Sequence, residues 1–78
     1  VDSYMSQIYR NLGVTELESD APRDAIPYFE KGLELAPGDS DLSALLRFAR
    51  VYRTKYTGSS DYQDYVLNLR MRREGCPE

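Results

Sequence analysis

The side chains that most often do chemistry in proteins are nearly absent from this sequence. It contains no histidine, so the commonest general base and the commonest transition-metal ligand are both missing. Its single cysteine, Cys76, lies in the tail GCPE and has no second cysteine for a disulfide or a cysteine-based zinc site. We interpret Cys76 as an exposed tail thiol.

The acidic residues do not form a catalytic pair either. Those between positions 16 and 24 suit exposed helix ends and turns. The stretch Asp39-Ser40-Asp41 looks like a short acidic metal motif, but it stands where a helix must begin, and aspartate is a preferred N-cap residue. No glycine-rich phosphate loop is present. We therefore expect no enzymatic activity, no metal site and no cofactor.

Basic side chains recur at every third position in the second half of the chain, at Arg47, Arg50 and Arg53. They form either a docking strip for an acidic or phosphorylated partner or a solvated helix face. Residues 1–39 hold three basic and eight acidic side chains, whereas residues 40–78 hold seven basic and five acidic ones. This split favours contact with another protein, and the net charge of -3 argues against a nucleic-acid partner.

Tyrosine is the most abundant aromatic residue, with seven copies and no tryptophan. Tyr52, Tyr56, Tyr62 and Tyr65 lie close together around a turn that the sequence predicts. We interpret them as amphipathic packing residues whose hydroxyl groups reach water. The other interpretation is that some of them are anchors at a protein interface.

The length of 78 residues allows one small domain with a thin core. A composition of 41% hydrophobic and 29% charged residues is usual for a helical globular domain. No apolar run approaches the roughly 20 residues that cross a bilayer, and residues 1–10 lack the features of a signal peptide. Because the chain opens on Val1 rather than methionine, we expect it to be a piece of a longer protein.

Apolar residues recur at helical spacing in four segments, and no segment alternates with the period of a strand. The predicted helices span about residues 3–19, 23–36, 41–56 and 61–73. Asp20 is expected to cap the second helix, and Asp39 with Ser40 the third. Pro37-Gly38 should end the second helix, and Gly58 should act as the C-terminal cap of the third.

The predicted fold class is therefore all-α, with two consecutive antiparallel helical hairpins in a single domain over residues 1–74. The first hairpin spans about residues 3–36 and the second about 41–73, and residues 75–78 form a tail.

Small and bulky residues follow a fixed order in residues 6–39. The series is Tyr9, Leu12-Gly13, Ala25, Phe29, Gly32 and Pro37. In residue types, spacing and length this segment resembles one tetratricopeptide repeat, a helical hairpin of about 34 residues. Gly13 and Ala25 should let the two helices approach closely, and Gly32 should make room for the next hairpin. Glu16 departs from the pattern, because the family usually has an aromatic residue there.

Residues 40–73 are a weaker copy of the same pattern. Leu46 matches, but Arg47 replaces the glycine and Tyr65 stands where a small residue is expected. The late position of Gly58 predicts a longer first helix in this half. A degenerate repeat suits the end of an α-solenoid, where one face must meet water. At least three repeats are usually needed for stability, so we expect further repeats upstream or self-association.

The resemblance implies a non-catalytic module that binds a peptide or a partner's helix in a concave groove. The alternative is a structural element that joins copies of a larger protein. Transferred by position, the groove residues are Gln7, Arg10, Val14 and Leu17 from the first repeat and Leu45, Phe48, Val51 and Tyr52 from the second, beside Glu18, Asp41 and Ala44. Some family members bind a C-terminal carboxylate with a lysine and an asparagine; here Arg10 and Val14 stand at those positions.

Overall fold

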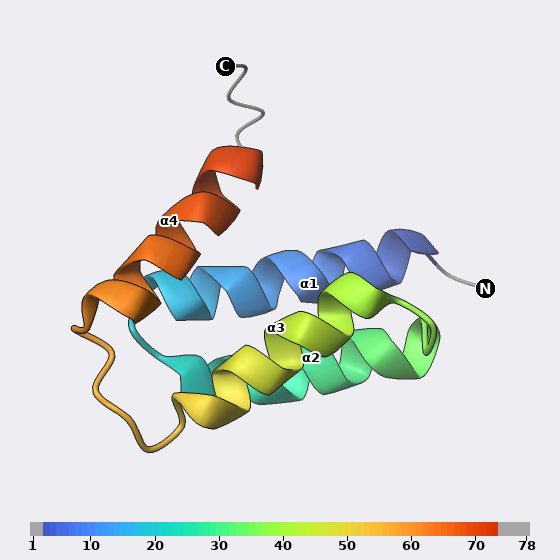
Figure 1. The fold of residues 1–78 in the computed structure, drawn as a ribbon. Helices are drawn as coiled ribbons and strands as arrows, with labels where there is room; N and C mark the ends of the chain where they lie inside the picture. The colour runs from blue at the N-terminus through green and yellow to red at the C-terminus, as the bar shows by residue number, and fades with distance from the viewer. Residues whose placement is uncertain (1–2, 74–78) are drawn as a thin grey trace.

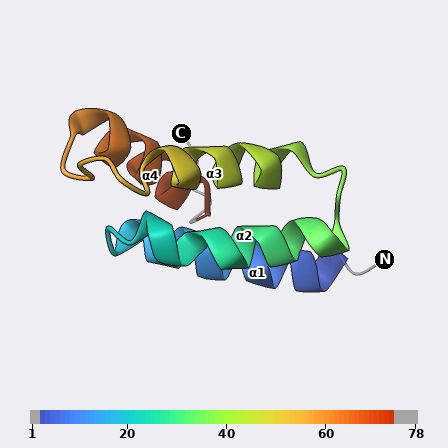
Figure 2. The same cartoon turned by 90° about the horizontal axis from the view of Figure 1, so that it is seen from below.

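The computed structural model describes residues 3–73, and this part of the chain forms four α-helices and no strand. The helices are α1 (Ser3–Glu18), α2 (Pro22–Leu35), α3 (Ser40–Val51) and α4 (Ser60–Arg73). Helix α1 packs along α2, and α2 packs against α3, which confirms the predicted all-α class built from helical hairpins. The helices lie in two layers, which Figure 2 shows edge-on with α3 and α4 above α1 and α2, and the molecule measures 36 × 33 × 18 Å.

Glycines set the close approach of the first three helices. A Cβ atom added to Gly13 of α1 would overlap the ring of Phe29 of α2, so the residue that Gly13 accommodates is Phe29. A Cβ atom at Gly32 would lie 3.0 Å from a methyl group of Leu42 in α3. Gly32 therefore makes room for the second hairpin, as the sequence predicts.

The end of α1 depends on Asp20, whose φ of 61° lies in the left-handed region. The backbone N–H of Ala21 donates to the carbonyl of Glu16, and that of Asp20 donates to the carbonyl of Leu17. These two bonds form a Schellman motif. The prediction that Asp20 caps α2 is wrong, because the N-cap is Ala21, which makes no side-chain hydrogen bond, and Pro22 follows in the first turn.

Helix α3 begins as predicted and ends earlier than predicted. The carboxylate of Asp39 accepts hydrogen bonds from the backbone N–H groups of Asp41 and Leu42, which confirms the N-cap. The helix ends at Val51 rather than near residue 56, so it is shorter than α1. The side chain of Tyr52 at the C-cap packs into an aromatic cluster, so the chain leaves the helix there although Arg53 and Lys55 are good helix formers. Gly58 has no left-handed φ and lies in a turn before α4, so it does not cap α3.

All four helices contribute to one core. Tyr62, Val66 and Leu69 recur one turn apart on α4 and place that helix in the same cluster as α1, α2 and α3. The remaining buried hydrophobic residues are Val14, Leu17, Ala25, Phe29, Leu42, Leu45, Leu46 and Ala49. Helix α4 rises from the C-terminal end of α1 and diverges from α3 (Figure 1). The two helices of the second hairpin are therefore joined mainly by side chains.

Candidate functional site

Four aromatic side chains bridge the space between α3 and α4. The ring of Phe48 stacks on that of Tyr65, with centroids 3.8 Å apart and planes 10° from parallel. Phe48 also stacks on Tyr62 at 5.4 Å, and Tyr52 meets Tyr62 edge to face at 5.1 Å. We call Phe48, Tyr52, Tyr62 and Tyr65 the aromatic cluster. It joins two helices whose backbones diverge.

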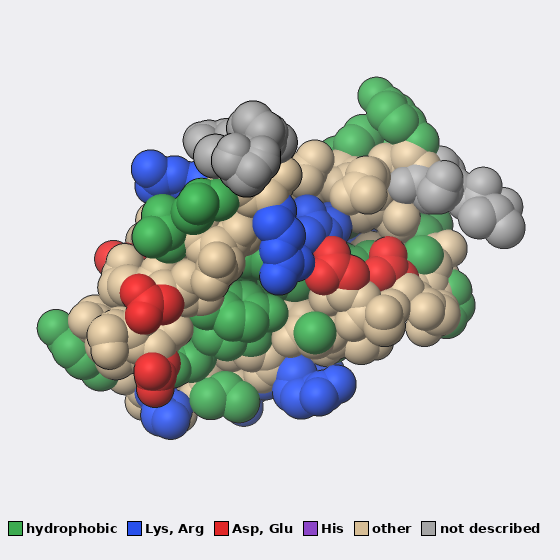
Figure 3. Space-filling view, turned by 45° about the horizontal axis from the view of Figure 1, so that its top comes forward, with side chains coloured by type: hydrophobic (Ala, Val, Ile, Leu, Met, Phe, Trp, Pro, Cys, Tyr) green, Lys and Arg blue, Asp and Glu red, His purple; other side chains and the backbone are tan. Residues whose placement is uncertain are grey.

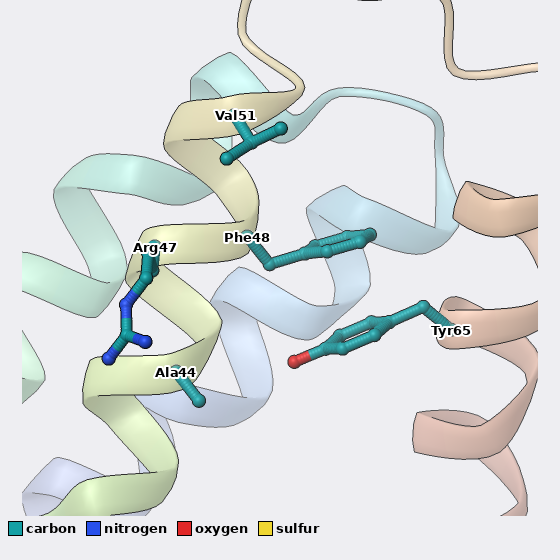
Figure 4. A pocket seen from close by; sticks show the side chains of 5 residues that line it. All are labelled: Ala44, Arg47, Phe48, Val51 and Tyr65. Carbon is teal, nitrogen blue, oxygen red and sulfur yellow. The ribbon is translucent and has the colours of Figure 1, made fainter.

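One side of the aromatic cluster is open to solvent. There Ala44, Arg47, Phe48, Val51 and Tyr65 line a hollow of about 280 Å³, which we call the α3–α4 hollow. Figure 4 shows the Phe48 and Tyr65 rings facing each other from α3 and α4, with Ala44 and Arg47 along α3. This volume lies just below the range of about 300–1,000 Å³ for ligand pockets, so it suits an inserted side chain better than a cofactor.

Tyr62 anchors α4 to α1 behind this hollow. Its side chain is fully buried, and its hydroxyl donates a 2.6 Å hydrogen bond to the carbonyl of Leu17. Burial, aided by the negative charge of Asp20, raises the pKa of Tyr62 to about 12. The expectation that the tyrosine hydroxyl groups reach water is therefore wrong for Tyr62.

Basic side chains surround the phenol of Tyr65 at the edge of the hollow. Burial, together with the charge of Asp41, raises the pKa of Tyr65, and the positive charges of Arg72, Arg10 and Arg47 oppose that rise. Figure 3 shows hydrophobic side chains gathered near the centre of one face, with basic and acidic side chains along their border. The hollow thus combines an aromatic floor with a charged edge.

Three of the predicted groove residues belong to the core. Val14, Leu17 and Leu45 are 1%, 0% and 0% exposed, so they offer no accessible surface to a partner in this structure. Helix α4 packs on α1, and its Tyr62 reaches the Leu17 carbonyl. The groove prediction assumes that this face of α1 is open to a partner, whereas in the structure α4 packs on α1.

The remaining predicted groove residues separate into two places. Gln7 is exposed on α1. The side chain of Arg10 is only 16% exposed, and its Nε lies 2.6 Å from Oδ2 of Asp41 in an ion pair. Phe48 and Val51 line the α3–α4 hollow, and Tyr52 packs within the aromatic cluster. The structure therefore brings together Phe48, Val51 and Tyr52 on α3 and pairs Arg10 of α1 with Asp41, whereas Gln7 lies apart from them.

The hollow also includes Arg47 and Tyr65, which the groove prediction omits. Residues 44, 47, 48 and 51 share one face of α3 because they recur at three- and four-residue spacing, and that signal is present in the sequence. Tyr65 carries no such local signal, because only the path of α4 brings it against Phe48.

The predicted basic strip does not act as one surface. Arg50 lies 3.4 Å from Glu30 of α2, whereas Arg47 faces the hollow and Arg53 is exposed beyond the end of α3. The ammonium of Lys55 lies 5.4 Å from the centre of the Tyr52 ring. Each of these four cations thus has its own surroundings, and Arg47 is the one among them that borders the hollow.

Comparisons with protein-family models, with curated proteins and with solved structures find no match to this chain. Within residues 3–73, no group of histidine, cysteine, aspartate and glutamate side chains is arranged to hold a metal ion. No helix in the same range has the length and apolar character needed to cross a membrane.

Proposed function

We propose that this chain is a non-catalytic protein–protein interaction module and that the α3–α4 hollow holds an apolar side chain of the partner. The observation that carries the proposal is the accessible aromatic floor, in which Phe48 is half-buried beside Val51, which is 48% exposed. A peptide or helix with an apolar anchor fits such a floor. The tetratricopeptide-like order of residues 6–39 supports a binding role over a catalytic one.

The test is a selection of peptides from a random display library on the intact chain, followed by affinity measurements on purified variants. Phe48→Ala should weaken binding of the selected peptides by on the order of 30-fold, because a truncated aromatic anchor often costs about 2 kcal/mol. Its circular-dichroism melt must be measured alongside, because Phe48 also holds α3 to α4. Lost binding with a retained transition supports the hollow.

Two further variants form a matched pair that does not disturb the aromatic cluster. Val51 is 48% exposed in the hollow, and Leu67 is 49% exposed outside it on α4. Val51→Ala should weaken peptide binding, whereas Leu67→Ala should leave it unchanged. Equal affinities for all three variants and the parent would place binding elsewhere and contradict the proposal.

The second candidate function is self-assembly through α4. Leu67 and Met71 lie one turn apart on α4 and are 49% and 45% exposed, so they form a short apolar ridge. Sedimentation should then show a concentration-dependent dimer that Leu67→Ala weakens and Val51→Ala does not. A chain that stays monomeric up to about millimolar concentration, where even a weak interface becomes populated, would exclude this second function.

A further inference from the structure

The charges around the α3–α4 hollow are unbalanced. Arg10 is neutralised by Asp41 at 2.6 Å. Arg47 and Arg72 are exposed, and among residues 3–73 no carboxylate lies within ion-pair distance of either of them. Arg47 lines the hollow, and Arg72 stands seven residues after Tyr65 on α4, so it lies on the helix face that carries the aromatic floor. The charges of Arg10 and Asp41 therefore cancel, and the positive charges of Arg47 and Arg72 remain without a carboxylate partner among residues 3–73.

We propose that the partner segment is acidic, with one apolar side chain against Phe48 and Tyr65 and carboxylates beside Arg47 and Arg72. This inference rests on the proposed function and specifies the partner's chemistry. A guanidinium group donates two parallel hydrogen bonds to a carboxylate, and a cation at the edge of an apolar pocket interacts more strongly than one in bulk water. A lysine-rich segment would be repelled at the same place.

The position of the cations also sets the spacing within the partner. Arg47 projects from the third turn of α3, on the side of the hollow opposite α4, and Arg72 comes from the last turn of α4. The aromatic floor lies between these two helices. A segment that runs from α3 across the floor and then along α4 therefore passes Arg47 before its apolar anchor and Arg72, two turns beyond Tyr65, after it. Acidic residues are expected on both flanks of the anchor rather than on one.

The experiment uses the display selection on the intact chain and reads the sequences that emerge. Peptides whose binding depends on Phe48 should be enriched in aspartate and glutamate on both sides of a leucine, isoleucine, methionine or phenylalanine. Selected peptides are then remade with asparagine and glutamine in place of the acidic residues. The neutral versions should bind on the order of tenfold more weakly at low salt, and the difference should shrink as NaCl is raised.

Charge-neutralising variants of the chain supply the reciprocal test. Arg47→Gln and Arg72→Gln together should weaken the acidic peptides on the order of tenfold and leave the neutral versions almost unchanged. Arg23→Gln, an exposed arginine at the start of α2, is the matched control and should have no effect. All three substitutions lie at exposed positions, so the fold should persist.

The outcomes separate the inference from the function on which it rests. Peptides that depend on Phe48 but show no acidic enrichment, or that ignore the arginine substitutions, overturn the inference and leave the interaction module standing. A selection without any peptide that depends on Phe48 contradicts both. A dimer that Phe48→Ala abolishes would show that a second copy of the chain occupies the hollow, and would overturn the inference as well.

Discussion

The two helical pairs of this chain use their apolar residues in opposite ways. In the first pair, α1 and α2 approach so closely that Gly13 has no room for a Cβ atom beside Phe29, which is fully buried. In the second pair, α3 and α4 diverge, and the stacked rings of Phe48 and Tyr65 span the gap between them. The close pair buries its central aromatic side chain completely, whereas the open pair leaves part of its aromatic surface accessible to solvent. A binding role is therefore expected in the second half.

The largest expected difference between the two pairs comes from their central phenylalanines. Phe29→Ala should destabilise the fold by about 3–5 kcal/mol, because it removes a fully buried ring from a site that cannot collapse. Phe48→Ala should cost less than Phe29→Ala, because Phe48 is half-buried and faces the hollow. Urea denaturation of both variants measures the difference. Equal losses would mean that the open pair is packed as tightly as the close one.

A glycine series tests how close the approach is. Gly13→Ala should cost about 1–3 kcal/mol, because the ring of Phe29 cannot move away from the new methyl group. Gly32→Ala should cost less, since the nearest Leu42 methyl group is 3.0 Å away and can shift slightly. Gly38→Ala is the control, because nothing lies within 4 Å of an added Cβ atom. If Gly13→Ala behaves like Gly38→Ala in urea, the close approach is not real.

The hydroxyl of Tyr62 provides a pH-dependent measure of how α4, the outer helix of the open pair, is held on α1. Its pKa is raised from 10.0 to about 12, so the folded state favours the neutral phenol. That stabilisation is complete below pH 10 and is lost as the pH rises from 10 towards about 12, because the unfolded chain ionises first. Burial also raises the pKa of Tyr65, which adds to the alkaline loss.

Tyr62→Phe should remove the larger part of this alkaline loss and cost about 0.5–1.5 kcal/mol near neutral pH. The cost is modest because the Leu17 carbonyl keeps its hydrogen bond from the Asp20 backbone N–H. Tyr56→Phe, at a side chain that is 79% exposed, is the control and should change neither quantity. Thermal melts across the alkaline range measure both. An unchanged pH profile for Tyr62→Phe would show that another group titrates.

The smallest expected effect lies in the turn between α1 and α2, within the close pair, and has the opposite sign. Asp20→Gly should stabilise the chain by up to about 1 kcal/mol, because glycine adopts a positive φ without strain and the change removes a negative charge from the end of α1. It also removes an exposed hydrogen bond from Gln63, which limits the gain. Asp20→Asn should give part of the effect. Lower stability of the glycine variant in urea would contradict the Schellman assignment.

The sequence predicts those features that depend on neighbouring residues. The Asp39 cap, the end of α2 before Pro37 and the contact of Gly32 with the second hairpin all follow from local chemistry or from the spacing within residues 6–39. The left-handed Asp20 also has a local signal, since aspartate is among the few residues besides glycine that tolerate this conformation. That signal competes with the preference of aspartate for helix N-caps, and the sequence prediction assigned Asp20 to the N-cap of α2 instead of the C-terminal turn of α1.

The path of α4 could not be predicted in this way. The periodic apolar residues beyond Val51 continue the helical pattern to about residue 56. The helix nevertheless ends at Val51, and Tyr52 packs against Tyr62 of α4 in the aromatic cluster. The position of Leu17 likewise involves α4, which is distant in sequence, because the Tyr62 hydroxyl bonds to the Leu17 carbonyl. Local periodicity identifies these residues as one face of a helix, but it does not identify what covers that face.

The hydrogen bond from Tyr62 to Leu17 joins residues that are 45 positions apart, and this separation has a consequence for the order of folding. Contacts among α1, α2 and α3 link neighbouring helices, so they close short loops, whereas docking of α4 closes the longest loop in the domain. Helix α4 also makes few contacts with the rest of the domain, and a segment with few contacts opens at a lower free energy than the whole domain. Helix α4 should therefore exchange its amide hydrogens through a partial opening that leaves α1–α3 folded, and each such opening frees the Leu17 carbonyl from the Tyr62 hydroxyl for a moment.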